Sequence, residues 1–297
     1  MIKTTPSVGL LFMPFSRHTL VAMTVFPLFA FLVSACATVG NAPESASTGS
    51  TVINPSFDEV IALSFAPPAS TVAYGDDTLQ YSLLWEPGVA PRATLFFIHG
   101  GCWLNAYDVN HARALASALA RDGFRVVAVE YRRVGDEGGG WPGSFDDVSS
   151  ALVQVAGQTQ EPLVVLGHSA GGHLALLLAS RRPDLVHAAI GLAAITDLES
   201  YARGENSCET ATPQFMGGTP EEQPDVYSQA TLVNKAFSVP VSLLQGLKDP
   251  IVPVSHTRLN GARTRLVEDA GHFDWLHPQA EAYTVLLDEL SKVLGSL

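Results

Sequence analysis

A serine in a glycine-rich turn between two apolar segments constrains this chain more than any other feature. The turn is a Gly-x-Ser-x-Gly pattern at residues 167–171, with Ser169 at its centre. The apolar residues 162–166 before it suit a strand, and the apolar run after it favours a helix. A serine in so tight a turn has a strained backbone, and its hydroxyl projects at the carboxyl edge of the sheet. This context predicts a nucleophile at Ser169, whereas an incidental serine in a glycine-rich connection is the alternative.

The glycines and the helix of this turn have physical roles of their own. Gly167 and Gly171 leave room for neighbouring backbone where a Cβ would collide. The helix that follows Ser169 directs free N–H groups and its positive dipole end toward an anion formed there.

Strands alternate with helices along most of the chain. Its 297 residues are 47% hydrophobic and 15% charged, which fits one sizeable α/β domain and an additional segment. Helices are expected around residues 112–119, from a capping box at 144–147, after Ser169 and from Pro278 onward. Strands are expected at residues 70–86 (a hairpin turning at 75–77), 93–98, 126–130, 162–167, 188–195, 240–246 and 264–268. We therefore expect a mostly parallel, doubly wound sheet of about eight strands, with helices on both faces.

The alternation lapses between residues 198 and 237. Polar residues, Gly217-Gly218 and the prolines at 220 and 224 interrupt short helical pieces there. We interpret this segment as an insertion that forms a lid over the carboxyl edge of the sheet.

An acyl-transfer serine needs a base, an acid that orients the base, and donors for the oxyanion. Asp249 follows the expected strand at 240–246, and His272 follows the next strand. Both would lie at the carboxyl edge with Ser169, where α/β proteins bind ligands. Asp197 is a second candidate acid. His256 and His277 are alternatives to His272.

The expected oxyanion donors are the N–H of Ala170 and the loop that begins at His99. This loop reads His-Gly-Gly-Cys-Trp, and we expect Gly101 and Cys102 to donate from it while His99 braces it. Trp103, Tyr131 and His168 are the candidate pocket residues. Packing is an equal alternative for Trp103, and a salt-bridged strand end is one for the segment of Tyr131.

The chain resembles the α/β-hydrolase fold, in its esterase/lipase and kynurenine-formamidase-like branch. The resemblance spans about residues 79–294 and depends on residues 99–103, 167–174 and the Trp-Pro pair at 141–142 before a helix. It implies a hydrolase of esters or amides without metal or cofactor. Ser169 would attack the carbonyl, His272 would carry the proton and Asp249 would orient His272, in the family's order of nucleophile, acid and histidine.

The sequence departs from this family in two places. Cys102 stands where the family usually has Gly or Tyr. Only 14 residues separate Asp249 from Thr264, so the helix usual between these strands must be short or missing.

The N-terminus resembles a bacterial lipoprotein signal. Basic residues precede 14 uncharged residues at 19–32, and small residues precede Cys36, which would become the lipidated first residue. An ordinary signal peptide or a short anchor are the alternatives, and each of the three takes the protein out of the cytoplasm. We expect a signal at residues 1–35, a flexible tether at 36–52 and the hydrolase domain at 53–297, with the lid at about 198–237.

Charge and cysteines limit the partners. The net charge is −12, and the 15 basic and 29 acidic residues after Cys36 leave −14. This excess argues against nucleic-acid binding and against electrostatic attachment to anionic lipid. An oxidising compartment permits a disulfide, but we expect Cys102 and Cys208 to be free, buried thiols.

These observations favour a serine carboxylesterase that is tethered in the cell envelope and acts through an acyl-enzyme on a small ester. An arylformamidase-like amidase or a small peptidase is the second hypothesis. A catalytically inactive binding protein of the envelope is the third. The acyl group and the oligomeric state stay open, because the lid that shapes the pocket has no informative pattern.

Overall fold

The computed structural model describes residues 52–295. The expected signal peptide at 1–35, the lipidation site Cys36 and nearly all of the tether at 36–52 lie outside these residues. Within residues 52–295, no helix is long and apolar enough to cross a membrane.

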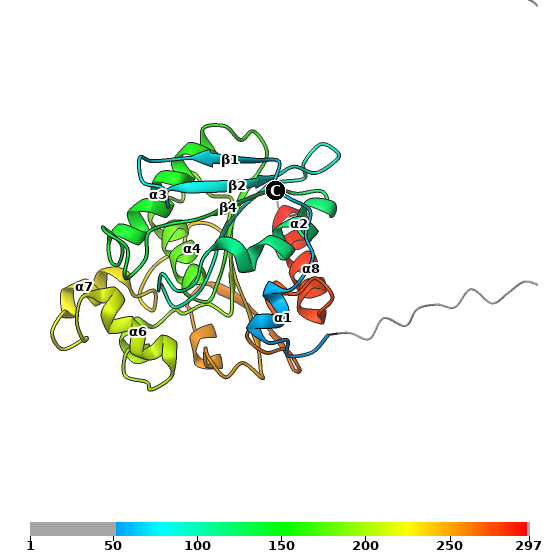
Figure 1. Ribbon diagram of the computed structural model, residues 1–297. Helices are drawn as coiled ribbons and strands as arrows, with labels where there is room; N and C mark the ends of the chain where they lie inside the picture. Colours follow the sequence, from blue (N-terminus) through cyan, green and yellow to red (C-terminus); the bar gives the residue numbers. More distant parts are fainter. Residues whose placement is uncertain (1–51, 296–297) are drawn as a thin grey trace, which may run out of the picture. The chain divides into compact units, whose positions relative to one another are not determined.

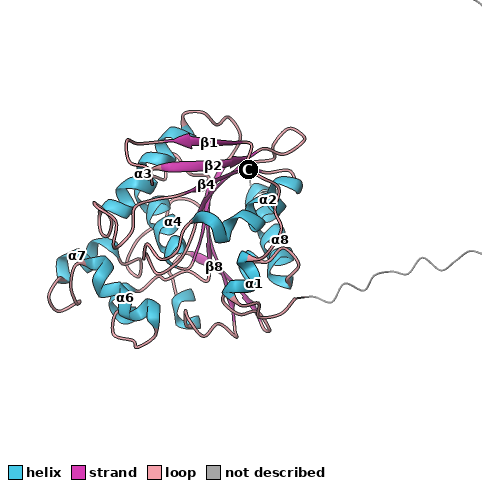
Figure 2. Ribbon diagram, in the orientation of Figure 1, coloured by secondary structure: helices cyan, strands magenta, loops and turns pink. Residues whose placement is uncertain are grey.

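The described part is organised around one eight-stranded sheet with the order β1-β2-β4-β3-β5-β6-β7-β8. The first two pairings, β1 with β2 and β2 with β4, are antiparallel, and the others are parallel. This arrangement confirms the expected mostly parallel sheet (Figures 1 and 2). The strands are β1 (Ser70–Ala73), β2 (Tyr81–Trp85), β3 (Thr94–Ile98), β4 (Arg125–Val129), β5 (Leu163–His168), β6 (Ala188–Leu192), β7 (Val241–Gly246) and β8 (Ala262–Val267).

Helices cover both faces of this sheet. Alternate residues of β3 point to opposite faces, so Phe96 and Ile98 pack in one core cluster while Leu95 and Phe97 pack in another. The first cluster contains side chains of α3 and α4, and the second contains side chains of α2 and α8. The helices are α1 (Phe57–Ile61), α2 (Arg113–Arg121), α3 (Gly143–Ala156), α4 (Ala170–Arg181), α5 (Leu198–Tyr201), α6 (Ser207–Met216), α7 (Pro224–Ala230) and α8 (Glu281–Gly295).

The capping box expected at residues 144–147 is wrong. Helix α3 begins at Gly143, and Ser144 uses its hydroxyl to donate to the Arg132 carbonyl at 2.5 Å. The Asp147 carboxylate binds the Arg132 guanidinium at 2.6 Å. Both side chains therefore fasten the helix to the segment after β4, and this tertiary contact replaces the local cap.

Two segments determine what covers the carboxyl edge. The connection from β7 to β8 contains only a 3-10 turn, Val254–Thr257, in agreement with the short spacing after Asp249. The segment between β6 and β7 contains α5, α6 and α7. The assignment of residues 198–237 as a lid domain stays a prediction.

Candidate active site

Ser169 occupies a sharp turn between β5 and α4. Its backbone has φ 55° and ψ −120°, a left-handed conformation that strains a residue with a Cβ. Its N–H donates to the Leu192 carbonyl at 2.8 Å, which fixes the turn against β6. A Cβ on Gly171 would lie 2.2 Å from the Ile98 carbonyl oxygen, so only glycine lets α4 start this close to β3. The sharp turn expected from the sequence is present.

The Ser169 hydroxyl has unused hydrogen-bonding capacity. The side chain is buried, and its Oγ has no hydrogen-bond partner among the described residues. Buried polar atoms are normally paired, and an unpaired one at a cavity is a common property of reactive sites.

His272 and Asp249 form a buried pair. Nδ1 of His272 lies 2.8 Å from Oδ2 of Asp249, and the two side chains are 4% and 0% exposed. Oδ1 of Asp249 accepts from the N–H groups of Ile251 and Val252 at 2.8 and 2.9 Å. Burial by itself would raise the pKa of Asp249, but the hydrogen bonds from His272 and the two amides outweigh it and lower the pKa below its ordinary value. Asp249 is therefore a carboxylate that can orient His272.

One cavity of about 120 Å³ brings Ser169 and His272 together. Its wall contains five residues proposed from the sequence, namely Gly101, Cys102, His168, Ser169 and His272. Asp249 lies behind His272 and does not line it. The remaining lining residues are Phe57, Tyr107, His111, Ser207, Cys208, Ile251 and Phe273.

The loop after β3 has an unusual backbone. Gly101, Cys102 and Trp103 have φ of 102°, 54° and 55°, so three successive residues are left-handed. A Cβ on Gly101 would lie 2.4 Å from the Tyr107 Cβ. Among the hydrogen bonds of residues 52–295, none uses the backbone N–H of Gly101, Cys102 or Ala170. The three amides expected from the sequence to hold an oxyanion therefore stay available for a ligand atom.

Two buried histidines support the loops of the site. His99 supports the loop after β3, and His168 supports the loop that contains His272. His99 binds the Gly100 carbonyl through Nδ1 at 2.8 Å and the Glu130 carboxylate through Nε2 at 3.0 Å. His168 donates from Nε2 to the His272 carbonyl at 2.9 Å. Burial, with the neighbouring His272, holds the pKa of His168 well below its usual range, so His168 is neutral.

Two expected pocket residues belong to the core. Trp103 is fully buried, stacks on Phe215 at 4.6 Å between ring centroids and does not line the cavity. Tyr131 is also fully buried, and its hydroxyl donates to the His99 carbonyl at 2.9 Å. The pocket assignment is wrong for both, because Trp103 packs on Phe215 of α6 and Tyr131 stacks on the His99 ring, with 4.5 Å between centroids.

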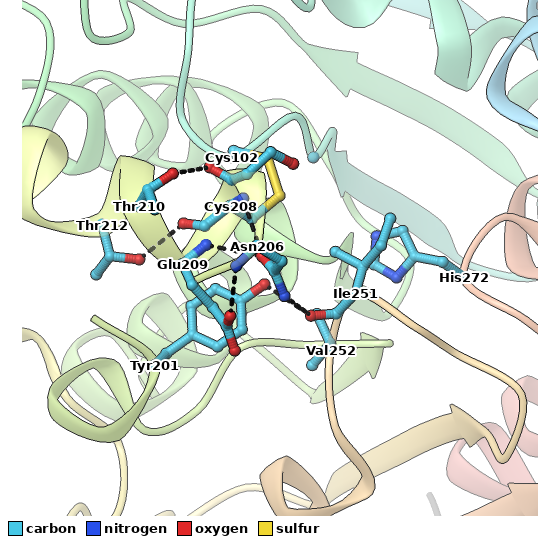
Figure 3. The surroundings of a disulfide bond; sticks show 12 residues. Cys102, Tyr201, Asn206, Cys208, Glu209, Thr210, Thr212, Ile251, Val252 and His272 are labelled. Carbon is cyan, nitrogen blue, oxygen red and sulfur yellow. Dashed lines mark hydrogen bonds between the residues drawn. A yellow bond between two sulfur atoms is a disulfide. The ribbon is translucent and has the colours of Figure 1, made fainter. Parts of the chain in front are cut away.

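The expectation of free thiols is also wrong. Cys102 and Cys208 form a disulfide, with 4.8 Å between their Cα atoms (Figure 3). The bond joins the loop after β3 to the first turn of α6. The two residues are 106 positions apart in the chain, so nothing in the local pattern indicates that they meet.

The alternative acid and bases have other partners. Asp197 caps α5 by accepting from the Ser200 N–H at 3.1 Å. Nδ1 of His256 accepts from the Thr196 N–H at 3.0 Å, and Nδ1 of His277 accepts from the Gln279 N–H at 3.2 Å. These three residues do not line the cavity that contains Ser169.

Sequence reasoning missed the contribution of the N-terminal segment. Phe57 begins α1 and packs edge-on against Tyr107, with 5.3 Å between ring centroids. A capping box formed by Ser56 and Glu59 starts this helix. The Ser-x-x-Glu pattern is visible in the sequence and could have predicted the helix. Among residues 52–295, His, Cys, Asp and Glu side chains form no group of three or more that could hold a metal ion.

Comparisons with known proteins agree with this architecture. A family model described as BD-FAE matches residues 87–260, more than half of the chain. Esterase B from Lactobacillus Rhamnosis (HN001) superposes with a TM-score of 0.62 at 18% identity, covering 80% of this chain and 89% of that one. This likeness shows that the fold is the α/β-hydrolase fold.

Curated relatives share part of their length with this chain. Esterase LipC of Mycobacterium tuberculosis is 26% identical over 263 residues, which cover 74% of this chain and 65% of LipC. Versiconal hemiacetal acetate esterase of Aspergillus parasiticus is 32% identical over 145 residues, which cover 44% of this chain and 45% of that enzyme. The chain therefore spans about half to two thirds of the length of these relatives.

Proposed function

The chain belongs to the BD-FAE family, an esterase family of the α/β-hydrolase fold, and from the geometry of its site we propose that it hydrolyses carboxylic esters through an acyl-enzyme on Ser169. One observation carries this proposal. Ser169 and His272 line the same cavity, and His272 is paired with the buried carboxylate of Asp249. The printed names of the curated relatives, which are esterases, support the choice of an ester bond.

The proposed reaction has two halves. Nε2 of His272 takes the Ser169 proton as Oγ attacks the ester carbonyl, and Asp249 stabilises the resulting imidazolium. The amides of Gly101, Cys102 and Ala170 hold the oxyanion. The tetrahedral intermediate then expels the alcohol, which receives the proton from His272. Water attacks the acyl-enzyme by the same route and releases the carboxylic acid, which restores Ser169.

The cavity favours small ester substrates. Its volume of about 120 Å³ is somewhat below that of an apolar cavity of roughly 150 Å³ that holds one benzene. Phe57, Ile251 and Phe273 make part of its wall apolar. We therefore propose acyl groups of a few carbons.

Kinetics on matched substrates test this function. Wild type should hydrolyse p-nitrophenyl acetate and butyrate, and Ser169→Ala should lose roughly 10⁴-fold or more of kcat/KM. N-formylkynurenine serves as the amide substrate. Higher kcat/KM on N-formylkynurenine than on both esters would favour an amidase, and no turnover of any of them would favour a binding protein.

We also propose that the protein is exported and tethered to a membrane through lipid on Cys36. The disulfide between Cys102 and Cys208 supports an oxidising compartment outside the cytoplasm. Cells expressing wild type and Cys36→Ser should be labelled with a palmitate analogue. The account expects label and membrane fractionation for wild type alone, and an unlabelled wild type would contradict it.

A further inference from the structure

The first turn of α6 contacts both halves of the candidate site. We infer that Asn206, Tyr201 and Cys208 are positioning residues. They fix the oxyanion loop, residues 99–103, and the loop of Asp249 relative to each other (Figure 3). The inference rests on the proposed esterase function. It concerns residues that lie outside the proposed triad and act through other groups.

The loop of Asp249 needs support from outside, because the connection from β7 to β8 contains only a 3-10 turn. The Ile251 carbonyl receives two hydrogen bonds from the insertion, from the Asn206 amide and from the Tyr201 hydroxyl, both at 3.0 Å. The N–H of the same residue donates to Asp249 at 2.8 Å. Side chains of the insertion therefore anchor the peptide segment that orients the acid.

The oxyanion loop is fastened to the same helix end by a covalent bond. Cys102 supplies one of the three proposed oxyanion amides, and it holds a left-handed φ of 54°. Its disulfide partner Cys208 follows Ser207, the first residue of α6. Fixing Cys208 therefore limits the movement of the Cys102 backbone.

Asn206 joins the two attachments. Its Oδ1 accepts from the N–H groups of Cys208 and Glu209 at 3.1 and 2.9 Å, so its amide nitrogen must be the atom that faces Ile251. One side chain thus caps α6 beside the disulfide and also anchors the acid loop. Asn206 does not line the cavity, so it acts on the reaction through its neighbours.

Two conservative variants test the hydrogen bonds that hold the loop of Asp249. Asn206→Asp keeps an oxygen that can cap α6 but loses the donor to Ile251, and Tyr201→Phe loses only a hydroxyl. Each should lower kcat on p-nitrophenyl acetate roughly tenfold and leave KM within about twofold, because displacement of a catalytic group by about 1 Å costs rate more than binding.

Tyr227→Phe is the matched control. Tyr227 is also fully buried in the insertion, and its hydroxyl donates to a carbonyl, that of Gly218, at 3.1 Å. Its hydroxyl bonds to Gly218 and not to the loop of Asp249, so the kcat of Tyr227→Phe should stay within about twofold of wild type. Equal kcat in Tyr201→Phe, Asn206→Asp and Tyr227→Phe would overturn the acid-side role.

The oxyanion side is tested by opening the disulfide. Dithiothreitol transfers two electrons and two protons to the bond, leaves thiols at Cys102 and Cys208, and itself becomes a cyclic disulfide. Reduced wild type should lose roughly ten- to a hundredfold of kcat, part of what loss of an oxyanion donor costs, and reoxidation should restore it. Cys208→Ser should match the reduced protein and should not respond to dithiothreitol.

Thiol titration and circular dichroism accompany these assays. Full kcat in a protein that titrates two thiols, or a loss that only parallels unfolding, would overturn the oxyanion-side role. Wild type that shows no turnover would refute the proposed function instead, so the two failures are distinguishable.

Discussion

Ser169 and Asp249 both follow parallel strands of one sheet, yet the two loops are held by different means. Ser169 follows β5 in the middle of the sheet, where the close approach of α4 to β3 leaves space for no side chain at Gly171. Asp249 follows β7, next to the edge strand β8, and the Ile251 carbonyl of its loop accepts side-chain hydrogen bonds from Tyr201 and Asn206. Backbone packing limits both segments, because a Cβ on Gly246 at the end of β7 would also lie 2.1 Å from the Ala270 carbonyl oxygen. Only the loop of the proposed acid also receives side-chain hydrogen bonds from the inserted helices. Filling the Gly171 contact beside the proposed nucleophile should affect folding, and removing the side-chain bonds to the loop of the proposed acid should affect rate.

The largest expected effect on rate comes from the carboxylate of Asp249, the proposed acid. Asp249→Asn keeps the shape of the side chain but removes the charge that stabilises the imidazolium, so kcat should fall by roughly 10⁴-fold. Asp197→Asn is the control, because asparagine also caps a helix and α5 should stay intact. Rate constants on p-nitrophenyl acetate decide between them, and a larger loss in Asp197→Asn would identify Asp197 as the acid.

A substitution in the tight turn around Ser169 should lower the stability of the fold. Gly171→Ala places a Cβ 2.2 Å from the Ile98 carbonyl oxygen and 2.3 Å from that of His99, so backbone has to move. We expect the free energy of unfolding to fall by about 3 kcal/mol in urea titrations. Gly157→Ala, whose nearest neighbour would be 3.5 Å away, should change it by less than about 1 kcal/mol. Equal free energies of unfolding for the two variants would contradict the close packing of the turn around Ser169.

Buried histidines make the fold sensitive to acid. Burial lowers the pKa of His256 to about 4, whereas an unfolded histidine titrates near 6.5. The unfolded state therefore binds more protons between these values, and the free energy of unfolding falls as pH falls from about 6.5 to about 4, by roughly 1 kcal/mol per pH unit for this residue. Urea titrations at pH 7 and pH 5 should show a smaller pH dependence in His256→Gln. An identical dependence in both proteins would refute the neutral His256.

The preference for acyl chain length should change least. Phe57 contributes to the cavity wall from α1, ahead of the residues that match the family model. Phe57→Ala removes a ring, so the ratio of kcat/KM for p-nitrophenyl hexanoate to that for the acetate should rise about three- to tenfold. Ile61→Ala, in the same helix but 49% exposed, should leave the ratio unchanged. An unchanged ratio in Phe57→Ala would remove Phe57 from the acyl site.

The elements that could be predicted from the sequence are those with a local pattern. The apolar run at 93–98 and the Gly-x-Ser-x-Gly turn each indicate their own structure, and α/β topology then brings the ends of parallel strands to one edge. The spacing after Asp249 also indicated that a helix is short or missing there. These signals depend on neighbours in the chain.

Features that depend on distant partners could not be predicted in this way. The disulfide joins residues 106 positions apart. Trp103 and Tyr131 are buried against the rings of Phe215 and His99, and Phe215 is more than 100 positions from Trp103 in the chain. Ser144 resembles a helix cap, yet its hydroxyl binds the Arg132 carbonyl. In each case tertiary packing decides among options that the local sequence leaves open.

Mapping a covalent phosphonate adduct tests the central claim most directly. The protein is treated with a fluorophosphonate, digested, and analysed by tandem mass spectrometry. The account predicts one adduct, on the hydroxyl of Ser169, and none in Ser169→Ala. An unmodified Ser169 in active wild type, or an equally reactive residue elsewhere in Ser169→Ala, would contradict it.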